Sequence, residues 1–221
     1  MSYYKIENLE EYFKHYKKSI REPKKFWDRI ASENFTWYQE WDNVIDFNMA
    51  EAEIKWFTNA KVNITKNCID RHLAKRGEKT AIIFEPNDPK EEALHITYNE
   101  LYERVSKMAN VLREQGVKKG DRVCIYLPMI PELAVSLLAC ARIGAIHSVV
   151  FAGFSASAVA SRINDCECKM VITSDGSYRG NKAIDLKGIV DEALEKCPTV
   201  EKVLVAKRTN TNVNMKAGRD Q

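Results

Sequence analysis

Residues 120–175 carry the pattern that most constrains the fold of this chain. Short apolar segments rich in β-branched residues alternate with longer helical segments, and Pro131 and Gly144 stand where a helix should begin and end. Strands joined by helices through short loops form a parallel sheet with right-handed crossovers. The sequence therefore predicts an α/β fold, in which helices flank a parallel sheet. The predicted elements are the strands Val123–Leu127, Ala145–Phe151 and Lys169–Ser174 and the helices Glu132–Ile143 and Ser155–Asp165.

Two loops of this unit follow predicted strands, at the edge where parallel sheets bind ligands. The first loop, Phe151–Ser155, combines a flexible backbone with the start of a helix. The second loop, Asp175–Lys182, carries Arg179 and Lys182 among glycines. A helix N-terminus and two cations favour an anion, so we expect an anionic ligand at this edge. The alternative is that both side chains are solvated loop cations without a ligand.

Composition and charge exclude several classes of protein. The 221 residues carry a formal net charge of +3 without a basic tract, so we expect no nucleic-acid partner. We expect no membrane partner either, because no stretch approaches the apolar length of a membrane span and the N-terminus lacks a signal-peptide pattern. The six scattered cysteines lack metal-ligand spacing, which predicts reduced thiols, no metal site and a cytoplasmic location.

The sequence contains none of the common catalytic or nucleotide-binding motifs. It has no glycine-rich dinucleotide fingerprint after a strand and no P-loop. No serine, histidine and aspartate stand at a spacing that indicates a catalytic triad. We therefore assign no catalytic residue to this chain.

The pattern of residues divides the chain into three parts. Residues 1–66 are polar and aromatic, with helix-start signals at Asn8 and Pro23, and predict a helical extension that packs on the rest of the chain. Residues 67–208 form the α/β unit, which includes a capping box at Thr97–Glu100 before an amphipathic helix. Residues 209–221 are polar and show no periodicity, which indicates a tail at a point of truncation.

Several short motifs carry a resemblance to a known family. They are Trp56-Phe57, Asn67–Leu73, Thr97–Leu101, Gly120–Val123, Tyr126–Glu132 and His147–Ser155. On these motifs the chain resembles, over nearly its whole length, the N-terminal part of the acetyl-CoA synthetase family. These are AMP-forming ligases of the adenylating superfamily. The resemblance implies that the predicted sheet belongs to the large N-terminal domain of an adenylate-forming enzyme.

The resemblance implies a reaction in two steps. Acetate attacks the α-phosphorus of Mg-ATP to give acetyl-adenylate and pyrophosphate, and the thiol of CoA then attacks the acyl carbon and releases AMP. Phe151, Ala152 and Gly153 match a segment that lines the path of CoA, and Arg179 and Lys182 match basic positions that hold its 3′-phospho-ADP end. Ala152 and Lys182 depart from the commoner glycine and arginine, and lysine lacks the bidentate fork of arginine.

The family's phosphate-gripping loop, acetate pocket, adenosine-binding residues and lysine-bearing C-terminal domain have no counterpart in this sequence. The resemblance therefore implies an N-terminal fragment that contributes CoA-binding surface and is inactive alone. We expect the isolated chain to self-associate through apolar surface that the missing part would cover. Propionyl-CoA synthetase or another short-chain acyl-CoA ligase remains open as the parent. A stand-alone, non-catalytic CoA- or nucleotide-binding module and a purely structural domain remain open as well.

Overall fold

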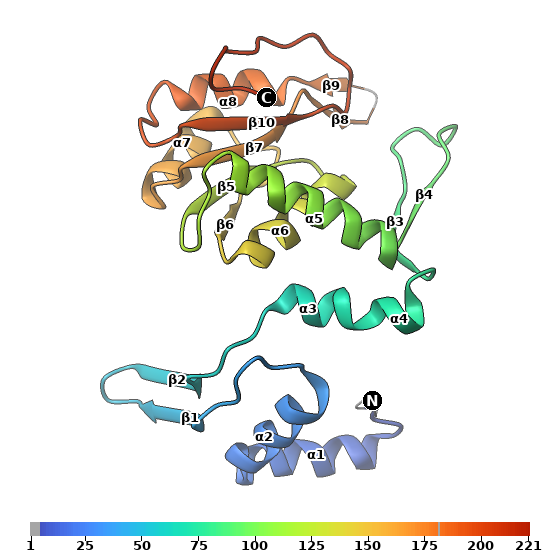
Figure 1. The fold of residues 1–221 in the computed structure, drawn as a ribbon, viewed down its shortest axis with the longest axis vertical. Helices are drawn as coiled ribbons and strands as arrows, with labels where there is room; N and C mark the ends of the chain where they lie inside the picture. Colours follow the sequence, from blue (N-terminus) through green and yellow to red (C-terminus); the bar gives the residue numbers. More distant parts are fainter. Residues whose placement is uncertain (1–4, 181) are drawn as a thin grey trace. The chain divides into compact units, whose positions relative to one another are not determined.

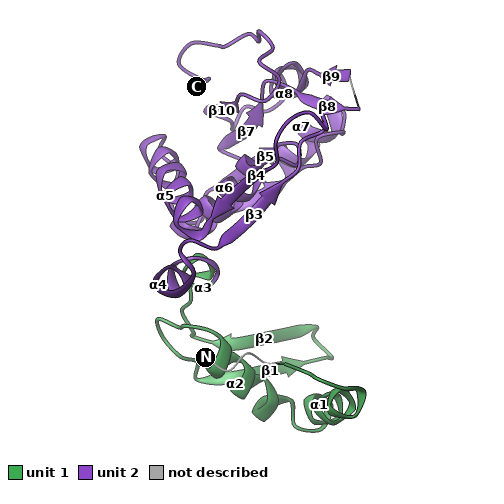
Figure 2. Ribbon diagram, turned by 90° about the vertical axis from the view of Figure 1, so that its right-hand side faces the viewer, with its two compact units in different colours: residues 1–67 green, residues 68–221 purple. Residues whose placement is uncertain are grey.

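The computed structural model describes residues 5–180 and 182–221, and the chain divides into two compact units. The first unit comprises residues 1–67 and the second residues 68–221 (Figure 2). The helix α3, Ile64–Cys68, lies at the boundary between them.

The first unit contains two helices followed by a β-hairpin. The elements are α1 Leu9–Arg21, α2 Pro23–Asn34, β1 Asn43–Asn48 and β2 Glu53–Thr58. The Asn8 side chain accepts the Glu11 N–H at 2.8 Å and so caps α1, as the sequence predicts. The prediction of a helical extension is wrong for residues 35–58, because this stretch contains the antiparallel pair β1 and β2 instead of a helix. Their turn, residues 49–52, contains no glycine or Asn-Gly signal from which a hairpin could be predicted.

The tryptophans of this first unit pack against neighbouring rings. Trp41 lies 5.0 Å from Trp37 and 4.9 Å from Phe57, measured between ring centroids. Two of the indole nitrogens also have partners, since Trp37 donates to the Ala31 carbonyl at 3.0 Å and Trp41 donates to Asp28 at 2.9 Å. Rings that pack on one another and bond through their polar edges stabilise a small unit.

The second unit is built on a four-stranded parallel sheet in the order β10-β7-β5-β6 (Figure 1). Val123 of β5 lies opposite His147 of β6 and Met170 of β7. The predicted parallel sheet flanked by helices is confirmed. The sheet and its helices are α5 Tyr98–Glu114, β5 Arg122–Tyr126, α6 Pro131–Ile143, β6 Ile146–Val149, α7 Ala156–Asp165, β7 Met170–Ser174, α8 Leu186–Leu194 and β10 Lys202–Ala206. Shorter elements are η1 Asp70–His72, α4 Leu73–Arg76, the pair β3 Thr80–Phe84 and β4 Leu94–Thr97, and the pair β8 Ser177–Arg179 and β9 Lys182–Ile184.

Helices cover both faces of this sheet, so most side chains of its central strand β5 are apolar and buried. Val123 and Ile125 belong to the core formed with α5 and α6, whereas Cys124 and Tyr126 belong to the core formed with α7 and α8. These four side chains of β5 are fully buried. A strand buried on both faces explains the continuous apolar run from which it was predicted.

The ends of the helices follow the local signals of the sequence. Thr97 and Glu100 form the predicted capping box at the start of α5. Gly144 ends α6 with φ of +76°, a left-handed conformation that glycine adopts without strain. These signals place the strands and helices of the second unit close to their predicted bounds.

The C-terminal segment, residues 208–221, returns to the outer edge of the sheet. The Val203 N–H of β10 donates to the Arg219 carbonyl, and the Gln221 N–H donates to the Val203 carbonyl, each at 3.0 Å. The segment thus adds a short parallel bridge, Val203 to Asp220, beside β10. Its sequence shows no periodicity because backbone groups and charged side chains make these contacts.

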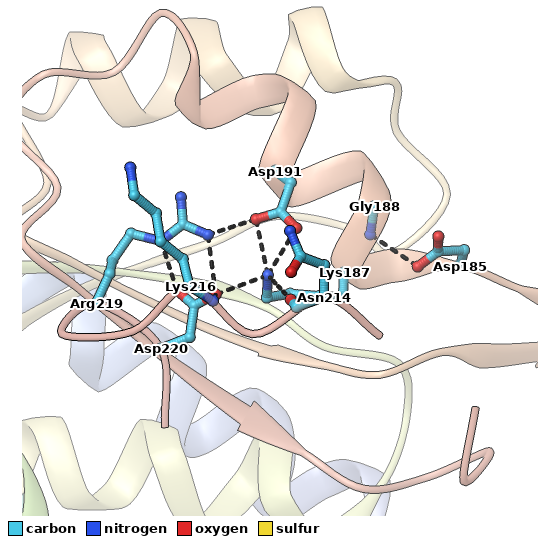
Figure 3. Close-up of polar contacts among 8 residues, drawn as sticks. All are labelled: Asp185, Lys187, Gly188, Asp191, Asn214, Lys216, Arg219 and Asp220. Carbon is cyan, nitrogen blue, oxygen red and sulfur yellow. Dashed lines mark hydrogen bonds and ion pairs between the residues drawn. The ribbon is translucent and has the colours of Figure 1, made fainter. Parts of the chain in front are cut away.

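Buried ion pairs hold this segment to α8 (Figure 3). The ammonium of Lys187 lies 2.7 Å from Asp191 and 2.9 Å from Asp220, and it donates to the Asn214 carbonyl at 2.9 Å. Arg219 also pairs with both carboxylates. Burial alone raises the pKa of Asp220, but hydrogen bonds from Arg219 and Lys187 outweigh it and hold the pKa at about 2.

Replacement of Asp220 by asparagine is expected to destabilise the second unit by about 2–3 kcal/mol near neutral pH, because it leaves buried cations without this anion. The folded pKa of Asp220 lies below its ordinary 3.8. Its contribution is therefore complete above that value and is lost as the pH falls toward about 2. The difference between wild type and variant should shrink over this range in urea unfolding followed by circular dichroism.

Two controls separate this effect from a general loss of stability. Asp165→Asn removes an exposed carboxylate at the end of α7 and should change stability by less than about 0.5 kcal/mol. As a second control, tryptophan fluorescence reports on the first unit, which contains all four tryptophans, while circular dichroism reports on both units. Equal stability of Asp220→Asn and wild type at neutral pH would contradict the proposed contribution.

Candidate functional site

A pocket of about 450 Å³ lies at the carboxyl edge of the parallel sheet. The residues after β5, β6, β7 and β10 all contribute to it, as expected where every strand points the same way. We call it the carboxyl-edge pocket. Its lining is Asn87, Pro128, Met129, Ile130, Phe151, Ala152, Gly153, Phe154, Ser177, Tyr178, Arg179, Ile184 and Arg208.

The order of the strands explains why a pocket forms here. The chain passes from β5 through α6 to β6, crosses back through α7 to β7, and thus places β6 and β7 on opposite sides of β5. The loops after β5 and β7 then lead to helices on opposite faces of the sheet. Such a reversal of strand order leaves a crevice between adjacent loops, and open α/β sheets bind ligands there.

The loop after β6 is held in place by hydrogen bonds and ring packing. The Tyr126 hydroxyl donates to the Phe154 carbonyl at 2.8 Å, and the Ser155 side chain caps α7. The Phe151 and Phe154 rings meet edge to face at 6.0 Å between centroids. A Cβ at Gly153 would lie 2.6 Å from the Phe151 ring, so glycine allows this ring to lie over the turn. Phe151 is 69% exposed and presents an apolar surface to a ligand.

The prediction that residues 175–182 form an irregular loop after β7 is wrong. Part of this stretch forms the antiparallel hairpin β8–β9. Strands of three residues are too short to show a β-pattern in the sequence. Arg179 lies directly opposite Lys182 in this hairpin, so the two cationic side chains are on the same face. Residue 181, which the sequence analysis includes in this loop, lies outside the described residues.

The structure brings together most of the residues that the sequence analysis selected. Phe151, Ala152 and Gly153 line the carboxyl-edge pocket together with Arg179. Lys182 does not line it, although it is the cross-strand neighbour of Arg179. Residues from two loops that are separate in sequence thus meet at one edge of the sheet.

The charge of the pocket is positive. Arg179 and Arg208 are the ionisable side chains with a permanent charge in its lining, and the lining contains no carboxylate. Across residues 5–180 and 182–221, no acidic side chain pairs with Arg179 or Lys182 within ion-pair distance. Like charges opposite each other in a hairpin repel, so an anion bound between them would be stabilised.

Sequence reasoning missed Arg208 and the segment Pro128–Ile130 as parts of the pocket. Both follow parallel strands directly, Arg208 after β10 and Pro128–Ile130 after β5. The carboxyl-end rule that selected Phe151 and Arg179 also applies to them. Their positions directly after predicted strands were therefore visible in the sequence. The sequence did not show which strands lie beside β10 and β5 in the sheet.

A buried carboxylate, Asp175, joins the loops that carry the two arginines. Its Oδ1 accepts the N–H groups of Gly176 and Arg208 at 2.7 Å and of Thr209 at 3.0 Å. Burial raises the pKa of Asp175, but the backbone N–H groups of Thr209, Arg208 and Gly176 outweigh burial and lower it. The ionised carboxylate therefore fixes the end of β7 to the end of β10.

No cluster of three or more histidine, cysteine or acidic side chains that could hold a metal ion occurs within the described ranges. Burial raises the pKa of the Cys140 and Cys168 thiols to about 12, so both stay protonated and poorly nucleophilic. Among the helices that the structure describes, none has the length and apolar content to cross a bilayer.

Two family models match this chain. A family model described as AMP-binding enzyme matches residues 69–220. The chain belongs to the AMP-binding enzyme family. A second model, described as acetyl-coenzyme A synthetase N-terminus, matches residues 12–68.

Individual relatives are similar over nearly the whole chain. An acetyl-coenzyme A synthetase of Desulfatibacillum aliphaticivorans is 55% identical over 95% of this chain and 32% of its own length. One of Magnetococcus marinus is 51% identical over 96% of this chain and 33% of its own. Among solved structures, acetoacetyl-CoA synthetase from Streptomyces lividans superimposes with a TM-score of 0.84 at 28% identity, covering 92% of this chain and 31% of that one. The chain thus spans about a third of the length of the curated relatives it matches.

Proposed function

We propose that this chain forms the CoA-binding wall of an AMP-forming acetyl-CoA synthetase. The observation that carries the proposal is the carboxyl-edge pocket, where an apolar turn, Phe151–Gly153, meets Arg179 in a lining without carboxylates. An apolar surface beside cations suits a ligand with a ring, a chain and phosphate groups. The names of the relatives support acetate as the acid that is activated.

Each selected residue has a role in this proposal. Phe151, Ala152 and Gly153 line the path of CoA, with the exposed Phe151 ring as an apolar surface. Arg179 and Lys182 hold the 3′-phospho-ADP end, and their cross-strand pairing supports joint contact with one phosphate group. Lys182 contributes as a point charge because it lacks the bidentate fork of arginine.

The complete reaction requires acetate, CoA and Mg-ATP as substrates, and the proposal assigns no catalytic or magnesium-binding group to residues 1–221. The unpaired cysteines support a reducing, cytoplasmic location. We also propose that residues 1–66 are an N-terminal extension, 67–208 the first α/β subdomain and 209–221 a polar segment. The junction of the two family models at residues 68 and 69 supports the first boundary.

The first test is calorimetric titration of the chain with CoA and with dephospho-CoA. Arg179→Ala should weaken CoA binding about tenfold or more, because a charge-assisted hydrogen bond contributes about 1.5–3 kcal/mol. Wild type should bind dephospho-CoA more weakly than CoA. Arg179→Ala should reduce the affinity for dephospho-CoA less than the affinity for CoA. Arg113→Ala, which removes an exposed arginine from α5, should bind as wild type. If neither the wild-type chain nor any variant binds CoA, these 221 residues are not sufficient to bind CoA.

The second test concerns the first chemical step. We expect the 221-residue chain to catalyse no acetate-dependent exchange between ATP and pyrophosphate, because no residue in it is assigned to grip the phosphates of ATP. A complete acetyl-CoA synthetase, assayed in parallel, serves as the positive control. Exchange above the no-acetate background would refute the prediction.

The third test concerns self-association, for which β6 is the expected surface. This edge strand exposes 54% of Ile146 and 48% of Val149. An unpaired apolar edge is a template for pairing with another chain. We expect concentration-dependent association in sedimentation velocity and its reduction in Ile146→Lys. Ile83→Lys, at an exposed isoleucine of β3, should leave it unchanged. A sharp monomer at high concentration would contradict this prediction.

A further inference from the structure

Arg208 occupies an unusual position in the carboxyl-edge pocket. Its guanidinium carbon contacts two aromatic rings, at 5.4 Å from the Phe84 centroid and 5.2 Å from that of Tyr178. Its backbone N–H is bound to Asp175, so the residue is fixed at the end of β10. Contact with two aromatic rings restricts the movement of the guanidinium, whose N–H groups can still donate to a phosphate.

The charge of this guanidinium is poorly compensated. Its nearest carboxylate is that of Glu91, 3.7 Å from Nη1, which is beyond the length of a charge-assisted hydrogen bond. The Arg208 side chain is only 16% exposed, whereas that of Glu91 is 49% exposed. Nη2 is buried and has no hydrogen-bond partner in the described part of the chain. A buried donor of a charged group without a partner is costly, so a closer anion would be favoured.

We propose that Arg208 is a second phosphate-binding residue of the carboxyl-edge pocket. When an anionic ligand enters, the guanidinium exchanges its long ion pair with Glu91 for hydrogen bonds to a phosphate group. Glu91 therefore competes with the ligand for Arg208. For CoA as the ligand this inference rests on the proposed function, and Arg179 and Arg208 then bind the same molecule from the ends of β7 and β10.

A purely structural role for Arg208 makes a different prediction. If the residue only joins Phe84, Tyr178 and Glu91, removal of the Glu91 charge should leave ligand binding unchanged or weaken it. If Glu91 competes with the ligand, the same change should strengthen binding. Glu91→Gln leaves Arg208 in place, so this variant remains informative even where Arg208 variants unfold.

The test is titration of the full 221-residue chain with CoA, dephospho-CoA and inorganic pyrophosphate. We expect Arg208→Gln to weaken CoA binding about tenfold and Arg208→Lys to weaken it less, because lysine keeps the charge without the fork. Glu91→Gln should tighten binding about threefold, in proportion to a half-exposed ion pair. The double variant should show no such gain. Glu92→Gln, at the exposed neighbouring position, and Arg113→Gln are the matched controls.

The ligands distinguish failure of this inference from failure of the proposed function. Equal losses in Arg208→Gln for CoA and dephospho-CoA assign Arg208 to the diphosphate, and a loss confined to CoA assigns it to the 3′-phosphate. If wild type binds pyrophosphate but not CoA, and Glu91→Gln tightens that binding, the anion site stands and the CoA assignment fails. If Arg179→Ala weakens CoA binding while Arg208→Gln and Glu91→Gln bind as wild type, the inference about Arg208 is wrong.

Discussion

The carboxylate of Asp175 connects the parallel sheet to the loops that carry the cationic side chains. One of its oxygens accepts three backbone N–H groups, which belong to Gly176, Arg208 and Thr209. Its own N–H donates to the Ala206 carbonyl at 2.9 Å, so β7 and β10 are joined past the point where their ladder ends. A Cβ at Gly176 would lie 2.9 Å from the Ile184 carbonyl, so only glycine fits this close turn. The two arginines therefore occupy fixed neighbouring loops.

The second constraint acts on the far side of β10. Lys187 and Arg219 pair with Asp191 and Asp220, and these contacts hold the C-terminal segment against α8 (Figure 3). Arg208 is the first residue of this anchored segment and lies two residues after the end of β10. A buried ion network contributes little net stability compared with apolar packing. Removal of one of its charged partners is nevertheless strongly destabilising, because it leaves an uncompensated buried charge. The network therefore holds the C-terminal segment in one arrangement.

Much of the second unit could be predicted from its sequence because local signals agree with the final contacts. The capping box at Thr97, the left-handed Gly144 and the apolar run of β5 each reflect a local requirement. The hairpins β1–β2 and β8–β9 were missed because their turns or strand lengths carry no comparable signal. Arg208 was missed for another reason. Its place in the pocket depends on β10 lying beside β7, which is a long-range pairing that no local pattern encodes.

The distribution of acids around the pocket decides which ligands it can accept. Asp175 directs its charge at backbone N–H groups, and the Asp191 and Asp220 carboxylates are occupied by Lys187 and Arg219. Glu91 is the acidic side chain that pairs with a pocket arginine among the described residues, and it does so at long distance. The pocket lining thus carries two arginines and no carboxylate. A cationic ligand would be repelled, whereas an anion gains from Arg179 and Arg208 without displacing a tight ion pair.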